Sequence, residues 1–98
     1  MLNFSRIHFI GIGGISMSAL AFLTSEAGVW VSGSDRNDSE TLQKLIAYGI
    51  NAYVGSNNSV VAKCDLVVYS SAIGDDDTEL KFARRNKSVV WNAKPIWL

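Results

Sequence analysis

The sequence predicts a three-layer α/β/α domain with a five-stranded parallel sheet, and three observations support this class. Short apolar runs alternate with helical patterns along the chain, which is typical of βαβ units. Two of these runs, Arg6–Ile12 and Leu66–Ser70, are almost uninterrupted, as in strands buried on both faces. The chain has 98 residues, 48% of them hydrophobic, which is enough for one core. We therefore assign residues 1–98 to a single domain.

The first strand and the first helix meet at a glycine-rich turn. Strand one is predicted at Arg6–Ile12, and helix one at about Gly14–Glu26. Gly28 follows the helix and can end it in the left-handed conformation. The helix is predicted to face the core through apolar residues at i, i+4 and i+7: Ile15, Ala19 and Phe22.

The middle of the chain repeats this alternation. A second strand is predicted at Val29–Ser32, followed by a loop of turn-forming residues at Gly33–Asp38. Helix two is predicted at about Ser39–Tyr48, because polar residues can cap its start and Gly49 stops it. The third strand is predicted at Ile50–Val54. The apolar face of helix two is expected to comprise Leu42, Leu45 and Ile46.

The last third of the chain adds two strands and one long helix. A short helical turn is predicted at Val60–Lys63 and strand four at Leu66–Ser70. Helix three is predicted at about Thr78–Asn86. The acidic Asp75–Asp77 precede it and basic residues lie near its end, so both ends complement the helix dipole. Strand five is predicted at Val89–Trp91.

Charge and cysteine content exclude several classes of function. Nine basic and nine acidic residues cancel, which argues against binding to nucleic acid or to an anionic membrane surface. The only cysteine is Cys64, so no intrachain disulfide and no cysteine-based metal site is expected, as suits a reducing cytoplasm. The apolar stretch Ile7–Leu23 is interrupted by His8 and by glycines, so we expect neither a signal peptide nor a membrane span.

The glycine turn is the strongest functional signal. Its spacing nearly matches the dinucleotide-binding pattern G-x-G-x-x-G, with Ser16 in place of the third glycine. Asp35 follows Gly13 at close to the spacing of about 20 residues expected for a ribose-binding acid. Amides at a helix N-terminus bind anions, although such glycines can also serve backbone geometry alone. The predicted phosphate-binding residues are Gly11, Gly13, Gly14, Ile15 and Ser16.

Two further groups of residues are candidate ligand contacts. Ser34 and Asp35 lie after the second strand, where they can accept from ribose or base, or merely cap a turn. At the carboxyl end of strand four, where ligands bind in open α/β sheets, stand Ser70, Ser71 and Ala72. These serines can equally be ordinary turn formers.

Other polar residues are interpreted as structural. His8 lies inside an apolar strand and is expected to be a satisfied core or edge histidine rather than a base. Cys64 is expected to pack, because no histidine is placed to activate it. Asp75–Asp77 are interpreted as a solvated helix start. The sequence shows no metal-ligand cluster and no phosphate loop of the Gly-x-x-x-x-Gly-Lys type.

Three blocks of sequence resemble the N-terminal domain of the Mur ligase family: His8–Ser18, Val31–Asp35 and Val67–Ile73. They occur in the family's order and spacing, and the resemblance covers essentially the whole chain. It implies a Rossmann-like domain that binds UDP-N-acetylmuramate. The members most similar to this chain join L-alanine to that nucleotide sugar, using ATP and Mg²⁺, in cytoplasmic peptidoglycan synthesis, which supports the cell wall, cell shape and cell division.

The resemblance also implies roles for individual residues. The loop Gly11–Ser16 would receive the diphosphate, Ser34 and Asp35 the uridine side, and Ser70–Ile73 would line the nucleotide site. In the family the ATP-binding loop lies in a later domain. The expected partner is therefore a downstream ATP-binding domain of the same polypeptide, with a C-terminal domain beyond it. This chain should hold no cofactor itself and should be inactive in isolation.

Two alternatives stay open, and three departures from the family pattern motivate the second of them. Ser16 replaces a usual glycine, Ser56 stands where many members have histidine, and Trp91–Lys94 replaces two basic residues, alanine and glutamate. The first alternative is an NAD- or FAD-binding domain of an oxidoreductase, which Asp35 and the glycine spacing permit but Ser16 and the Ser70–Ile73 block speak against. The second is a non-catalytic nucleotide-sensing module. Trp91, Ile96 and Trp97 also suggest a sticky patch that could form a homodimer.

Overall fold

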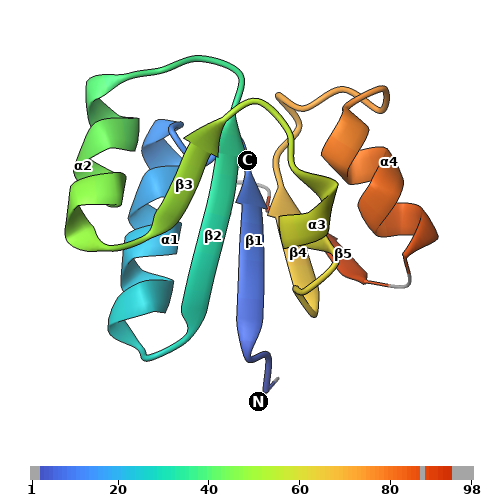
Figure 1. Cartoon of the computed structure of the whole chain (residues 1–98), viewed down its shortest axis with the longest axis horizontal. Helices are drawn as coiled ribbons and strands as arrows, with labels where there is room; N and C mark the ends of the chain where they lie inside the picture. Colours follow the sequence, from blue (N-terminus) through green and yellow to red (C-terminus); the bar gives the residue numbers. More distant parts are fainter. Residues whose placement is uncertain (1–2, 87, 94–98) are drawn as a thin grey trace.

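Five parallel strands form one sheet in the order β3-β2-β1-β4-β5 (Figure 1). The structure is a computed structural model that describes residues 3–86 and 88–93. The chain builds the sheet outward from β1 through β2 to β3, and then returns to the other side of β1 for β4 and β5. The predicted fold class is therefore confirmed. The strands are β1 Arg6–Ile10, β2 Trp30–Asp35, β3 Asn51–Val54, β4 Leu66–Tyr69 and β5 Val89–Asn92.

In the part of the chain that the structure describes, four helices lie on the two faces of this sheet. Figure 1 shows two of them beside β2 and β3, and the other two beside β4 and β5. Capping residues explain where three of them begin: Ser39, Asn57 and Asp77 each accept a hydrogen bond from a first-turn amide. The helices are α1 Ile15–Glu26, α2 Glu40–Tyr48, α3 Asn58–Val61 and α4 Thr78–Arg85.

Alternation along the strands divides the core into two parts. Ile7 and Phe9 of β1 belong to a cluster with residues of α1 and α2. Ile10 points to the opposite face and packs with residues of α3 and α4. Because side chains alternate along a strand, His8 also belongs to this second face. The α3/α4 face therefore combines apolar packing with buried polar groups, whereas the α1/α2 face is apolar.

The second strand is longer than its sequence predicts. The expected loop began at Gly33, but Gly33, Ser34 and Asp35 continue β2. The prediction was wrong because it weighed turn propensity, whereas β2 pairs with β1 on one side and with β3 on the other. Two ladders of backbone hydrogen bonds outweigh a local preference for a turn. This extension carries Ser34 and Asp35 to the carboxyl edge of the sheet.

The predicted core stripe of α1 was also wrong. Ile15 is 92% exposed and Phe22 is 39% exposed, and Ala19 is exposed too. The buried residues of α1 are Met17 and Ala21. The helix carries apolar residues on all sides, so the periodicity did not identify one face. In α2, Leu42 and Leu45 are buried as predicted, whereas Ile46 is 40% exposed.

The remaining boundaries differ only at element ends. β1 ends at Ile10 because Gly11 turns the chain with a φ of +81°. Asn57 caps α3, so this helix begins at Asn58 rather than at Val60. β3, β4, α4 and β5 each lie within one residue of their predicted ends.

Gly33→Ala is expected to lower the free energy of unfolding by about 1–3 kcal/mol, the usual cost of overpacking a core. A Cβ at Gly33 would lie 2.3 Å from Ile12 Cδ1 and 2.7 Å from Ile12 Cβ, and Ile12 is fully buried. Urea unfolding followed by tryptophan fluorescence measures the loss. Gly14→Ala is the control, because a Cβ there meets nothing closer than 3.5 Å. Equal stability of the Gly33→Ala variant and the parent would contradict this packing.

Candidate functional site

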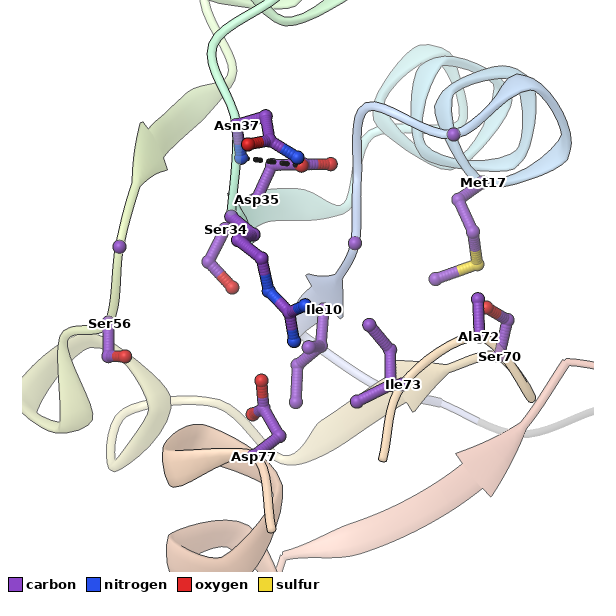
Figure 2. A pocket seen from close by; sticks show the side chains of 14 residues that line it. Ile10, Met17, Ser34, Asp35, Asn37, Ser56, Ser70, Ala72, Ile73 and Asp77 are labelled. Carbon is purple, nitrogen blue, oxygen red and sulfur yellow. Dashed lines mark hydrogen bonds between the residues drawn. The ribbon is translucent and has the colours of Figure 1, made fainter. Parts of the chain in front are cut away.

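A pocket of about 450 Å³ opens at the carboxyl edge of the sheet. It lies near the junction of β1 and β4, where the strand order reverses and open α/β sheets bind their ligands. Figure 2 shows Ser34 and Asp35 on one side of it, with Met17, Ser70 and Ala72 on the other. Its other lining residues are Ile10, Gly11, Gly14, Arg36, Asn37, Gly55, Ser56, Ile73 and Asp77.

The pocket brings together six of the ten residues predicted to contact a ligand. These residues come from the β1–α1 turn, the end of β2 and the β4–α4 loop: Gly11, Gly14, Ser34, Asp35, Ser70 and Ala72. The other four are Gly13, Ile15, Ser16 and Ser71, which are not among its lining residues. Ile15 and Ser16 nevertheless lie in the chain between Gly14 and Met17, both of which line the pocket.

The amides of the glycine turn are used inside the protein. Gly11 and Ile12 both donate to the carbonyl oxygen of Ser34, at 2.8 and 3.0 Å. Gly13 donates to Asp35 Oδ2 at 2.8 Å, and Gly14 donates to the Gly11 carbonyl at 3.1 Å. These bonds fix the turn against β2, and they leave none of the four amides free for an anion.

The first helical turn of α1 has amides without an acceptor among the described residues, whereas the amides of the glycine turn are bonded. Gly14 is the extended N-cap residue and supplies no side-chain acceptor. Among the described residues no acceptor is found for the amides of Ile15, Ser16 and Met17. The first turn carries no acidic side chain that would compete for this positive end of the helix. Three backbone donors therefore remain for an anion at the edge of the pocket.

Asp35 holds the glycine turn in place. Its Oδ2 accepts from the Gly13 amide at 2.8 Å. Its Oδ1 accepts from the Asn37 amide at 3.1 Å, the bond drawn in Figure 2. A carboxylate has further lone pairs, so these two bonds leave acceptor capacity for a ligand hydroxyl. The structure thus shows the turn-capping role considered for Asp35, and contact with a ribose remains a prediction.

A buried carboxylate that the sequence analysis missed lies under the pocket. Glu79, in the first turn of α4, is 1% exposed. Its Oε1 accepts from His8 Nε2 at 2.8 Å and from the Ser34 hydroxyl. Its Oε2 accepts from the Tyr53 hydroxyl at 2.7 Å and from the Asn57 amide at 2.8 Å. Two features of the sequence could have indicated this pair. Glu79 shares a helix face with the apolar Leu80 and Ala83, and His8 lies inside an apolar strand.

These contacts decide the charge of Glu79. Burial alone would raise the pKa of Glu79, but the hydrogen bond and charge of His8 and the hydroxyls of Ser34 and Tyr53 hold it below its usual value. Because the ionised carboxylate only accepts, His8 Nε2 carries a hydrogen and donates it. Burial and the bond to Glu79 raise the pKa of Tyr53 well above its usual value, so its hydroxyl stays protonated.

The structural interpretations of the other polar residues are confirmed. His8 is fully buried, and its Nδ1 contacts Ser32 Oγ at 2.7 Å. Cys64 is buried, burial raises the pKa of its thiol, and Sγ contacts the Val60 carbonyl at 3.4 Å. Asp77 caps α4 by accepting from the Leu80 amide at 2.9 Å, although it also lines the pocket.

The departures from the family pattern lie in different places. Ser56 is exposed at the rim of the pocket. Trp91 is 50% exposed on β5, whereas Lys94, Ile96 and Trp97 lie outside the described residues. Self-association through this patch therefore stays a prediction, and light scattering at high concentration tests it.

The described residues contain no cluster of metal-ligating side chains. Over residues 3–86 and 88–93, no group of three or more histidine, cysteine, aspartate or glutamate side chains is placed to hold one. Within the same ranges, none of the helices has the length and apolar character needed to cross a membrane.

Stability is expected to fall when Glu79 is protonated. Its folded-state pKa lies below the unfolded value of 4.5, so the ionised form stabilises the fold. This contribution is complete above about pH 4.5 and is lost as the pH falls through the folded-state pKa. Asp65 acts with the same sign, because amides of Ser5 and Arg6 outweigh its desolvation and lower its pKa. Urea unfolding from about pH 7 to about pH 3 should show the loss, and Glu79→Gln should weaken this dependence.

Comparison with known proteins gives one consistent result. A family model described as "Mur ligase family, catalytic domain" matches residues 6–94. The chain is 49% identical over 81 residues to a UDP-N-acetylmuramate–L-alanine ligase of Clostridium acetobutylicum, covering 83% of this chain and 18% of that protein. It is 45% identical over 87 residues to the ligase of the same name from Clostridium botulinum strain Eklund 17B, covering 89% and 19%.

A solved structure agrees with these sequence matches. The crystal structure of the UDP-N-acetylmuramate–alanine ligase from Thermotoga maritima matches with a TM-score of 0.85 and 34% identity, covering 92% of this chain and 21% of that one. The chain therefore spans about a fifth of the length of these relatives.

Proposed function

This chain belongs to the Mur ligase family, and on that premise we propose that it binds the UDP end of UDP-N-acetylmuramate. The complete enzyme would join L-alanine to the muramate carboxyl group in an ATP-dependent reaction of cytoplasmic peptidoglycan synthesis. The observation that carries the proposal is the start of α1, where three amides without an acceptor among the described residues adjoin the 450 Å³ pocket.

The pocket has a suitable group for each part of the ligand. The diphosphate would lie against the amides of Ile15, Ser16 and Met17, with Arg36 as a nearby cation. The uridine would lie toward Ser34 and Asp35 at the end of β2. The loop residues Ser70, Ser71 and Ala72 would close the side toward β4. In this proposal Gly11, Gly13 and Gly14 shape the turn, because their amides are already hydrogen-bonded within the protein.

The proposed contribution of this domain to the reaction is positioning. Holding the nucleotide end of a long substrate places its carboxyl group for reaction elsewhere, so remote binding energy supports orientation. The described residues contain no group of three or more histidine, cysteine, aspartate or glutamate side chains placed to hold a metal ion, and the sequence has no ATP-binding loop. We therefore assign ATP and Mg²⁺ to a further domain of the full-length polypeptide, and this chain alone should not catalyse ligation.

Calorimetric titration tests the proposal against its alternatives. UDP-N-acetylmuramate and UDP should each bind, whereas NAD and FAD should not. Binding of NAD without binding of either uridine nucleotide would overturn the assignment in favour of an oxidoreductase domain, which the family comparisons do not support. Binding of neither class would leave a module that kept the fold and lost the site.

A further inference from the structure

Glu79 connects three strands and one loop through a single buried side chain. It reaches from α4 to His8 on β1, Ser34 on β2 and Tyr53 on β3, and it also accepts from the Asn57 amide. Its two oxygens have different partners. Oε1 accepts from residues of β1 and β2, whereas Oε2 accepts from Tyr53 on β3 and from the Asn57 amide just before α3.

The Oε2 contacts bracket one wall of the pocket. Gly55 and Ser56 line the pocket, and they lie between Tyr53 and Asn57. Tyr53 donates its hydroxyl to Oε2 at 2.7 Å, and Asn57 donates its amide to Oε2 at 2.8 Å. The rim segment Gly55–Ser56 is therefore held on both sides by the same carboxylate oxygen.

The Oε1 contact reaches the neighbouring strand β2, which pairs with β3. Ser34 lines the pocket and donates its hydroxyl to Oε1. The Glu79 carboxylate thus links the end of β2 to the rim segment, in addition to the backbone bond that the Gly55 amide donates to the Asp35 carbonyl at 2.9 Å. An ionised carboxylate is costly to bury unless hydrogen bonds satisfy it, and here four donors converge on it.

We propose that Glu79 is a positioning residue of the nucleotide pocket, which fixes the rim segment Gly55–Ser56 relative to Ser34. This inference rests on the proposed function, because it names what holds one wall of that pocket in place. Glu79 touches no ligand in this account. It acts through Tyr53 and Asn57, and neither of these residues lines the pocket.

Tyr53→Phe tests the inference with the smallest change. It removes one donor to Oε2 and leaves Glu79, the Asn57 amide and every lining residue in place. We expect UDP affinity to fall about threefold to tenfold, as for loss of one hydrogen bond. Calorimetry should be done without denaturant, where unfolding curves show that parent and variant are both folded. Hydrogen exchange of the Asn57 amide should become faster in the ligand-free variant.

Ser32→Ala is the matched control. Ser32 is a buried hydroxyl of the same polar network, bonded to His8 at 2.7 Å, but it neither touches Glu79 nor lines the pocket. It should lower stability without changing UDP affinity or the exchange of the Asn57 amide. If the polar network only stabilises the fold, neither substitution should change UDP affinity.

The outcomes separate this inference from the proposed function. If the parent binds UDP and folded Tyr53→Phe binds it equally well, the positioning role of Glu79 is wrong and the proposed function stands. If the parent binds no UDP, the proposed function is wrong, and the positioning of a nucleotide pocket is overturned with it. If hydrogen exchange of the Asn57 amide is unchanged in Tyr53→Phe, Glu79 does not hold the rim segment in place, whether or not UDP binds.

Discussion

Glu79→Ala is expected to lower the free energy of unfolding by about 3–5 kcal/mol, the usual cost of breaking a buried charge-paired network. The substitution deletes the acceptor of four donors, two of which, His8 and Ser34, are buried. It also leaves a cavity beneath α4, because the Glu79 side chain is among the largest fully buried ones. A loss of this size is a large part of the stability of a small domain, about 5–15 kcal/mol.

Urea unfolding followed by circular dichroism measures this loss, and two variants make the result specific. Glu40→Ala is the matched control, since Glu40 forms an ion pair with Lys44 and its side chain is 85% exposed. That change should stay within about 0.5 kcal/mol of the parent, as surface substitutions usually do. Glu79→Gln keeps the volume and one acceptor oxygen, so its loss should be smaller. A Glu79→Ala variant as stable as Glu40→Ala would show that the network does not stabilise the fold.

Ile15→Pro is expected to weaken UDP binding about tenfold to hundredfold, the range for a hydrogen bond to a charged group. Proline removes the Ile15 amide, which is one of the three donors proposed to hold the diphosphate. The fold should tolerate it, because Ile15 is the first residue of α1 and its side chain is 92% exposed. Gly14 already has φ −66° and ψ 156°, the conformation preferred before proline.

The control for this change is Ile15→Ala, which removes the side chain and keeps the amide. Its UDP affinity should match that of the parent within about twofold, since side-chain contacts are not invoked. Unfolding curves should show nearly equal stability for all three proteins. If Ile15→Pro is folded and binds UDP like Ile15→Ala, the diphosphate does not lie at the start of α1.

Local signals in the sequence predicted most of the fold. The apolar runs located the five strands within a few residues, and the capping and stop residues of α2 located its ends. The glycine turn and Ser70–Ala72 could be assigned to the carboxyl edge because parallel strands all end there. The same local reasoning failed for β2, where Gly33–Asp35 has turn propensity but is paired on both sides.

The sequence also could not say which atoms of the site are available. It suggested the glycine amides as phosphate donors, but the structure uses Gly11 and Gly13 to bind Ser34 and Asp35 and leaves the first turn of α1 open. Such a choice depends on which acceptor lies nearest in space. Spacing along the chain does not contain that information.

By itself the sequence determined the order of strands and helices along the chain, the glycine turn and the family resemblance. Each of these depends on residues close together in the sequence or on recognisable blocks. Only the tertiary structure decided which face of α1 is buried, and which residue partners His8. Glu79 lies 71 positions from His8, and it meets His8 only because the return of the chain from β3 to β4 places α4 over the same face of the sheet. A contact of that kind depends on how separate elements pack, and packing is a property of the whole fold.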